Sequence, residues 1–217
     1  MLGEIQMTTV LYITEHNQKE RKSISSWVGE RFLREYKKSH PEDKIITINL
    51  SKENIPSIDN EFVDIFNKLK CGIQPSDLTT SEQNIISKFN KFADQFISAD
   101  KYIFVNPMFN HFLPNKLKAY LDAISMIGKT IKFNSNGPIG LLKEKKALHI
   151  QSSGGIYKHN DIESSDFGHK YLKYIMNFLG TETIDGIFID GLDVYKDKRD
   201  YLKKQASKKA IELAKTF

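Results

Sequence analysis

Apolar and polar positions along the chain form two patterns, short continuous apolar runs and longer stretches with helical spacing. The short runs are rich in β-branched residues and are typical of strands buried in a parallel sheet. They cover residues 8–14, 44–50, 101–106, 145–151 and 183–190. The stretches with helical spacing cover residues 23–36, 63–69, 81–99, 116–127, 171–179 and 201–215. Strands and helices in this order predict an α/β fold, with a parallel sheet covered by helices on both faces.

The length of 217 residues suits one α/β domain. No shift in composition, no linker and no internal repeat divides the chain. We therefore predict a single domain over residues 7–217. Residues 1–6 precede a second methionine, Met7, and are taken as an N-terminal extension or an added remnant outside the domain.

Composition excludes several kinds of protein. The one cysteine, Cys71, cannot form an internal disulfide or build a cysteine-based zinc site. No apolar run approaches the roughly 18 residues of a membrane span, and no signal-peptide pattern opens the chain. We expect a soluble, cytoplasmic protein without a membrane partner.

The net charge of +5 raises nucleic-acid binding as an alternative function. The lysines are scattered, however, and the densest group, in residues 196–209, alternates with acidic residues on a predicted helix. This pattern favours a solvated helix face over a nucleic-acid interface, which would need clustered basic and aromatic residues. A mildly positive protein still attracts an anionic ligand such as a nucleotide.

Three loops should meet where ligands bind to open parallel sheets, at the carboxyl ends of the strands. After the first strand, Ser23 and Ser25 stand at a predicted helix start, where free N–H groups suit a phosphate. Plain N-capping explains the same serines. No GxxxxGK(S/T) or GxGxxG motif accompanies them, which argues against a P-loop or a dinucleotide site.

The other two loops suit a flat ligand. Residues 107–114 mix Pro, aromatic and amide side chains that offer an apolar ledge, unless the loop only packs on the next helix. Residues 152–155 read Ser-Ser-Gly-Gly, which allows either close backbone approach to a ligand or a tight turn. Each signal is weak alone, and the three loops on one edge are stronger together.

The usual catalytic patterns are missing from the sequence. The six histidines show no metal-ligand spacing, and His149 lies in an apolar strand, as a core histidine does. There is no GxSxG motif. We predict no metal site and no catalytic side chain, because a pocket without acid–base groups commonly leaves the chemistry to a cofactor.

Three segments resemble those of a known family. They are Pro107-Met108-Phe109-Asn110 with residues 114–122 (PNKLKAYLD), residues 136–141 (NGPIGL), and Ser152-Ser153-Gly154-Gly155. In order and spacing the sequence resembles the FMN-dependent NADH-azoreductases, also described as NADH:quinone oxidoreductases, from about Met7 to the C-terminus. The resemblance implies a flavodoxin-like fold with five parallel strands in the order 2-1-3-4-5.

The resemblance also implies positions for bound FMN. The phosphate would fall on His16, Ser23 and Ser25, although relatives usually have Ser or Asn at the position of His16. The flavin ring would contact two loops, at Pro107, Met108, Phe109, Asn110, Ser152, Ser153, Gly154 and Gly155. His111 and Phe133 would face the substrate. His111 stands where many relatives have Phe, and Phe133 stands where some have Tyr. Ser153 stands where some relatives have Arg.

The activity that the resemblance implies is that of a homodimer with FMN near the subunit interface. NADH or NADPH, between which the sequence does not discriminate, would reduce the flavin and leave. The flavin would then pass two electrons to a quinone or an aromatic azo compound, in a ping-pong sequence. The alternative is a flavodoxin-type electron carrier without NADH turnover of its own. Such carriers are small and acidic, whereas this chain is longer and basic.

Overall fold

A five-stranded parallel sheet forms the centre of the structure, a computed structural model that describes residues 7–15, 23–159, 161 and 163–217. Its strands are β1 (Thr9–Thr14), β2 (Lys44–Asn49), β3 (Lys101–Pro107), β6 (Lys146–Ser152) and β7 (Thr183–Ile189). They lie in the order β2-β1-β3-β6-β7, and every neighbouring pair is parallel. The predicted flavodoxin-like strand order is confirmed, since it is 2-1-3-4-5 among the strands of this sheet.

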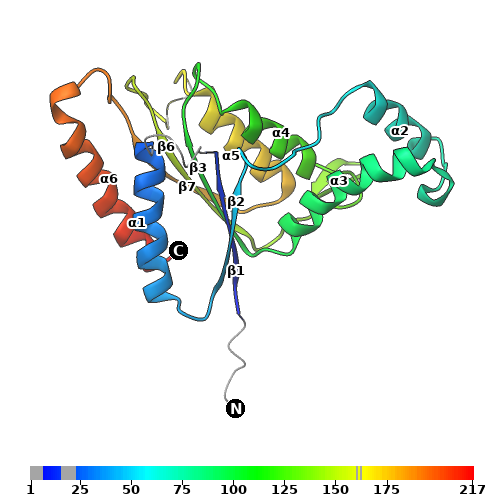
Figure 1. Ribbon diagram of the computed structural model, residues 1–217, viewed down its shortest axis with the longest axis horizontal. Coiled ribbons are helices and arrows are strands. Elements are labelled where there is room, and N and C mark those ends of the chain that lie inside the picture. The colour runs from blue at the N-terminus through cyan, green and yellow to red at the C-terminus, as the bar shows by residue number, and fades with distance from the viewer. Residues whose placement is uncertain (1–6, 16–22, 160, 162) are drawn as a thin grey trace, which may run out of the picture.

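Helices cover both faces of the sheet (Figure 1). On one face lie α1 (Ile24–Ser39) and α6 (Arg199–Ala214). On the other lie α3 (Thr80–Ile97), α4 (Asn115–Ile124) and α5 (Phe167–Leu179). Helix α2 (Asn60–Lys70) packs on the outer end of α3 and forms an arm with it.

Each face of the sheet has its own hydrophobic core. Leu11, Ile13 and Phe104 contribute to the core under α3, α4 and α5. Val10 and Val105 contribute to the core under α1 and α6. Since successive side chains of a strand point to opposite faces, a strand buried on both faces must be apolar throughout. This explains the apolar runs inside β1 and β3, whereas β6 also buries the polar residues His149 and Gln151, which are hydrogen-bonded.

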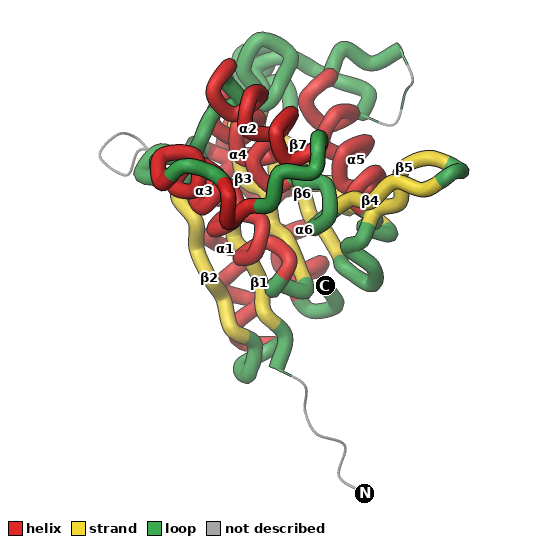
Figure 2. Tube along the Cα trace, turned by 90° about the vertical axis from the view of Figure 1, so that its right-hand side faces the viewer, coloured by secondary structure: helices red, strands yellow, loops and turns green. Residues whose placement is uncertain are grey.

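The sequence pattern missed a small antiparallel hairpin, formed by β4 (Ile131–Asn134) and β5 (Gly137–Gly140). Figure 2 shows it beside α5 and separate from the main sheet. Two single-turn 3₁₀ helices, Pro75–Asp77 and Lys196–Lys198, complete the described elements. The hairpin has little apolar alternation, because three of the four side chains of β4 are exposed.

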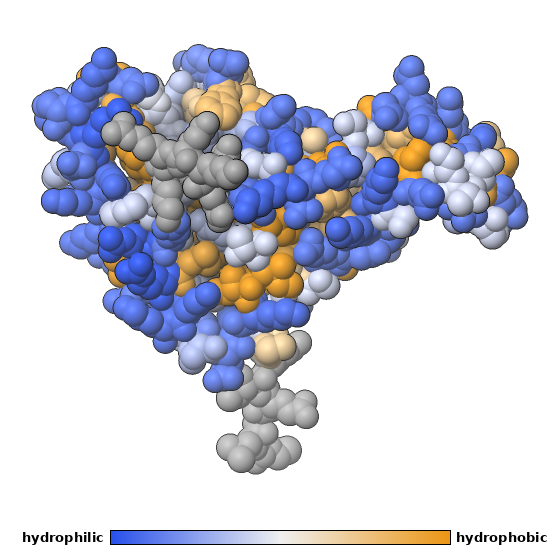
Figure 3. Space-filling model, viewed as in Figure 1, coloured by the Kyte–Doolittle hydropathy of each residue, from blue (hydrophilic) through white to orange (hydrophobic). Residues whose placement is uncertain are grey.

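Hydrophilic residues cover most of the surface seen in Figure 3. Hydrophobic residues gather near the centre of that view, over the region of β1 and the edge strand β2. In the part of the chain that the structure describes, no helix is both long enough and apolar enough to span a membrane.

Candidate functional site

The carboxyl ends of the strands meet at one edge of the sheet (Figure 1). In register, Thr14 of β1 lies opposite Val105 of β3, and Pro107 lies opposite Ser152 of β6. The N–H of Met108 donates to the carbonyl of Ser152 (2.8 Å), which joins the loops after β3 and β6 directly. The structure thus brings the second and third predicted loops together at the edge where open α/β sheets bind ligands.

The start of α1 supplies the predicted phosphate position. The hydroxyl of Ser23, the N-cap, accepts a hydrogen bond from the N–H of Ser26 (3.2 Å). Ser25 is fully buried, with its hydroxyl 3.0 Å from that of Ser23. The N–H groups of Ile24 and Ser25 have no acceptor among the described residues. Ser23 is therefore a helix cap, and the helix start beside it has donors that suit an anion. His16 lies outside the described residues.

The loop after β3 is a tight two-residue hairpin turn. Phe109 and Phe112 exchange both backbone hydrogen bonds, at 3.0 and 2.8 Å. Between them, Asn110 and His111 have φ angles of 49° and 62°. Positive φ at both central residues is the geometry of a type I′ turn, in which Asn is common. The side chain of Phe109 is left open at the rim, since this residue is 56% exposed.

Two helix starts hold this turn in place. The N–H groups of Phe167 and Gly168, in the first turn of α5, donate to the carbonyl of His111 at 3.0 and 3.2 Å. First-turn N–H groups have no partner inside their own helix, so the turn serves as their acceptor. On the other side, Pro114 is the N-cap of α4. The segment with Met108, Phe109 and Asn110 is thus anchored at both ends.

Residues 153–155 extend β6 alongside the segment that follows β7. Their three carbonyls accept hydrogen bonds, at 2.6 to 3.2 Å, from the N–H groups of Gly191, Leu192 and Asp193. The N–H groups of Gly154 and Gly155 have no acceptor among the described residues. This segment therefore uses its carbonyls inside the protein and keeps two N–H donors for a ligand.

Contacts inside the protein explain the residue types in this segment. A Cβ on Gly154 would meet the carboxylate of Asp193, an exposed side chain that would have to move aside, so the lack of a side chain at this position leaves room for Asp193. The hydroxyl of Ser153 lies 2.7 Å from Oδ1 of Asp190 and 3.0 Å from the carbonyl oxygen of Gly155. Ser153 is buried, and its hydroxyl supports the segment from within.

The two predicted substrate residues lie in different places. The ring of His111 stands edge-on to that of Tyr157, with Nδ1 3.4 Å from the Tyr157 hydroxyl, at the site. Phe133 lies on the β4–β5 hairpin, whose last residue, Gly140, packs against Leu179 at the C-terminal end of α5. The loops described above contact the N-terminal end of this 13-residue helix, which is about 20 Å from its C-terminal end. A single chain does not bring Phe133 to them.

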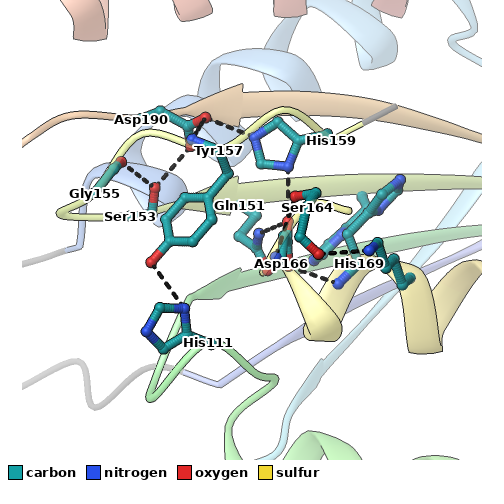
Figure 4. Close-up of polar contacts among 12 residues, drawn as sticks. His111, Gln151, Ser153, Gly155, Tyr157, His159, Ser164, Asp166, His169 and Asp190 are labelled. Carbon is teal, nitrogen blue, oxygen red and sulfur yellow. Dashed lines mark hydrogen bonds and ion pairs between the residues drawn. The ribbon is translucent and has the colours of Figure 1, made fainter. Parts of the chain in front are cut away.

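A buried polar network lies behind residues 153–157, and the sequence analysis missed it (Figure 4). The ring of His159 bridges two carboxylates: Nδ1 is 2.7 Å from Asp166, and Nε2 is 2.6 Å from Asp190. Asp166 also accepts hydrogen bonds from the N–H of His169, as the N-cap of α5, and from Nε2 of Gln151. His159, Asp166 and Asp190 lie on two loops and at a helix start, far apart in the sequence and without a regular spacing. No local sequence motif therefore marks them.

Two further histidines continue the network beneath the turn. His149 is fully buried in β6, with Nε2 3.0 Å from Oδ1 of Asn106 and Nδ1 3.0 Å from Nδ1 of His169. The side-chain amide of Asn106 donates in turn to the carbonyl of Pro107 (2.9 Å). The prediction of a core histidine with satisfied hydrogen bonds is confirmed for His149.

Electrostatics divides the histidines of this network into two kinds. Burial lowers the pKa of His159, but hydrogen bonds and charge from Asp166 and Asp190 outweigh burial and raise it to about 9. Burial lowers the pKa of His169 to about 4, despite the nearby charge of Asp166. Burial and the neighbouring His169 hold the pKa of His149 well below its usual value. At neutral pH the network therefore holds one imidazolium and two neutral rings.

The rest of the described chain offers little that competes with this edge. A shallow hollow between α2 and α3, lined by Asp64, Lys68, Cys71 and Glu82 among others, contains none of the predicted site residues. Among the described residues, no group of His, Cys, Asp and Glu could hold a metal ion.

Fold and site together define a flavodoxin-like α/β protein whose candidate site lies at the carboxyl edge of the sheet. The family described as "Flavodoxin-like fold" matches residues 8–213. A relative in Bacillus licheniformis, named FMN-dependent NADH:quinone oxidoreductase 2, is 41% identical over 211 residues, which is 97% of this chain and the whole of that protein. One in Staphylococcus haemolyticus, named FMN-dependent NADH:quinone oxidoreductase, is 43% identical with the same coverage. The chain belongs to the FMN-dependent NADH:quinone oxidoreductase family of flavodoxin-like proteins.

Solved structures agree with this assignment. An azoreductase from Bacillus anthracis has a TM-score of 0.88 at 29% identity, over 97% of this chain and all of that one. An FMN-dependent NADH-azoreductase from Bacillus anthracis, solved in complex with FMN, has a TM-score of 0.81 at 32% identity, over 96% of this chain and all of that one. The chain is therefore an enzyme of the quinone oxidoreductase and azoreductase type, and the electron-carrier alternative is disfavoured.

Proposed function

We propose that this protein binds FMN at the carboxyl edge of its sheet and uses it to transfer two electrons from NADH or NADPH to a quinone or an aromatic azo compound. The observation that carries the proposal is that the start of α1 and the loops after β3 and β6 lie at this edge, and that the helix start and residues 154 and 155 offer N–H groups without an acceptor among the described residues. Full-length relatives with FMN and NADH in their names support it.

The donor groups of the site fit the two ends of FMN. The start of α1, with Ser23 and Ser25, would hold the phosphate, because unpaired N–H groups and the helix dipole favour an anion. His16 stays a prediction for the same contact. The N–H groups of Gly154 and Gly155 would donate to the polar edge of the ring, and Phe109 would offer it an apolar surface.

Bound FMN would supply the redox chemistry, by accepting hydride from the nicotinamide and passing two electrons to the acceptor in a ping-pong sequence. The protein's own part is to position the ring and to present N–H donors where negative charge accumulates on reduction. Fixed backbone donors need no reorganisation as this charge develops. No side chain is required as a general acid, and we assign no catalytic residue.

We also propose a homodimer in which the substrate face is completed by the partner subunit. Within one chain Phe133 is remote from the loops and 58% exposed. Several large apolar residues around the site are more than half exposed as well, namely Phe109, Ile156, Phe167 and Tyr174. A second copy that covers these residues would explain both observations. Sedimentation equilibrium tests this proposal, which a monomer at micromolar concentration would contradict.

We also propose the domain boundaries and the cellular location of the protein. We propose that residues 7–217 act as one domain, with residues 1–6 outside it. A cytoplasmic location accords with an NADH-type donor and with the free, exposed thiol of Cys71.

The absorption spectrum of the purified protein with FMN tests the proposed function. Under anaerobic conditions, NADH or NADPH should bleach the visible bands of the bound flavin, and a quinone should restore them. Bound flavin that neither nucleotide reduces would identify an electron carrier instead. A protein that binds no flavin would overturn the proposal.

A further inference from the structure

His159 occupies an unusual position between two carboxylates. Its side chain is 8% exposed, and the two ring nitrogens face Asp166 and Asp190 at 2.7 and 2.6 Å. A carboxylate accepts hydrogen bonds, so each short contact requires an N–H on the ring. With an N–H on both nitrogens the ring is an imidazolium, and its charge lies between two anions.

The two carboxylates connect His159 to different parts of the site. Oδ1 of Asp190 accepts from the hydroxyl of Ser153 (2.7 Å), and its Oδ2 lies 3.3 Å from the N–H of Tyr157. These contacts fix both ends of residues 153–157, which we call the glycine segment. Asp166 caps the start of α5 through the N–H of His169 (2.9 Å). The same imidazolium thus ties the glycine segment to the helix that holds the turn after β3.

A flat aromatic surface fixes the plane of the histidine ring. The ring of Phe188 on β7 stacks on that of His159, with centroids 3.6 Å apart and planes 12° from parallel. The ring of Phe188 can lie there because residue 186 is glycine, where a Cβ would collide with it. A cation on an aromatic face is favourable, and the stack orients both ring nitrogens toward their carboxylates.

We propose that His159 is a positioning residue, a charged cross-link that acts through Asp190 to hold residues 153–157 in their ligand-binding conformation. The inference deepens the proposed function, on which its ligand rests. His159 itself reaches the site only through Asp190, Ser153 and Tyr157. Without its charge, the buried Asp166 and the partly buried Asp190 would be two neighbouring anions, which repel each other and are costly to desolvate.

The charge state of this cross-link depends on the groups that face it from each packed element. These are Asp166 and His169 from α5, His149 from β6, Asp190 after β7, and Tyr157 in its own loop. Since the two carboxylates raise the pKa of His159 to about 9, the cross-link is charged at neutral pH and loses its charge above that value. The conformation it holds should therefore weaken in the same range of pH.

The test is the affinity for FMN and for riboflavin of the wild-type protein and of His159→Gln, from pH 7 to 10. At pH 7 the variant should bind both ligands roughly tenfold more weakly or worse, as expected when one partner of a buried charged network is removed. The two losses should be equal, because riboflavin lacks only the phosphate. Wild-type affinity should fall toward that of the variant as the pH passes about 9.

A second readout needs no flavin. Amide hydrogen exchange of the free protein should show weaker protection of Gly191, Leu192 and Asp193 in His159→Gln, because their N–H groups donate to the carbonyls of residues 153–155. If the wild-type protein binds no flavin, the proposed function fails, and the exchange measurement still decides whether His159 positions the segment.

Matched variants keep the proposal falsifiable. His40→Gln, at the C-cap of α1, makes the same change away from the network and should have no effect. Asp190→Asn should reproduce the losses, and combining it with His159→Gln should add little, since both act through one path. Asp190→Asn alone also tests the proposal if His159→Gln does not fold. Ligand affinities and amide protection within about twofold of wild type in both folded single variants would overturn the proposal.

Discussion

The two halves of the candidate site are built on different physical principles. The half at the start of α1 is a helix terminus, with one serine cap, a buried second serine and N–H groups without an acceptor among the described residues. The half at residues 153–157 is fixed by backbone pairing and by a buried network that contains three histidines and two aspartates. A helix terminus suits a point charge, whereas a fixed segment suits a flat ring whose orientation matters. If FMN binds as proposed, ligand charge and ligand shape are recognised by different halves of the site, so substitutions in the two halves should have separable effects.

The largest effect is expected from Gly154→Val. The new side chain would force the exposed carboxylate of Asp193 aside, and we expect its branched Cβ to crowd the segment. We expect loss of both FMN and riboflavin binding by about two orders of magnitude, with about 1–3 kcal/mol of overpacking cost to stability. Fluorescence titration with both ligands measures it. Asp193 also provides a control: Gly154→Ala should be harmful alone and partly restored by Asp193→Ala. Failure of that rescue would assign the role of the glycine to the ligand instead of to Asp193.

Removal of the histidine charge should change stability with pH. The pKa of His159 is about 9 in the folded protein and near 6.5 when unfolded. A raised folded pKa means that the stabilisation is complete below about pH 6.5 and is lost as the pH rises through about 9. We expect the unfolding free energy of wild type to exceed that of His159→Gln by about 1–3 kcal/mol at pH 6.5, with a much smaller gap at pH 10. Urea titrations across this range measure the gap; a gap independent of pH would show that the charge plays no part.

His169 should produce the opposite slope on the acid side. Burial lowers its pKa to about 4, so the unfolded chain binds a proton more readily than the folded one. A depressed histidine pKa destabilises the folded state as the pH falls from about 6.5 toward 4. His169→Gln should flatten this part of the stability profile, by roughly 1–2 kcal/mol at pH 4.5 relative to pH 7. An unchanged acid slope in the variant would mean that other groups dominate it.

Ser25→Ala should act on the charged half alone. The side chain is buried at the helix start, and we expect FMN to bind about tenfold more weakly while riboflavin binding stays the same. Ser26→Ala is the matched control, since the Ser26 hydroxyl also contacts that of Ser23, at 2.9 Å, without being a predicted ligand contact. Equal losses for the two ligands would place the phosphate elsewhere.

The smallest effect is expected from Phe133→Ala. Because this exposed ring is remote from the loops of its own chain, flavin affinity and stability should be unchanged. If a partner subunit presents it to the acceptor, the KM for a bulky quinone should rise a few-fold, in line with the loss of one apolar contact of about 1 kcal/mol. Steady-state kinetics with quinones of different size measures it, and identical kinetics would remove Phe133 from the substrate face.

Much of the fold could be predicted from the sequence because its central strands are buried on both faces. Residues 102–105 are apolar throughout for that reason, and the sheet order was predicted from the resemblance to a known family. The β4–β5 hairpin could not be predicted in this way. Its strands have four residues each, three of the four in β4 are exposed, and β5 reads Gly-Pro-Ile-Gly, so no apolar run or alternation marks them.

Local chemistry marks some parts of the candidate site in the sequence, whereas parts formed by distant residues carry no such mark. Serines at a helix start and adjacent glycines after a strand are visible in the sequence, and the structure places both at the carboxyl edge of the sheet. His159, Asp166 and Asp190 become neighbours only through folding, and a search for metal-ligand spacing passes over a histidine that binds carboxylates. Ser153 shows the converse: its hydroxyl, a predicted ligand contact, is directed to Asp190.

The most direct test of the two-part site is the amide spectrum of the protein during titration with FMN and then with riboflavin. The account predicts that both ligands shift the amide signals of Gly154 and Gly155, while FMN alone shifts those of Ile24 and Ser25. Shifts at the helix start with riboflavin, or no shift at the glycines with either ligand, would contradict it.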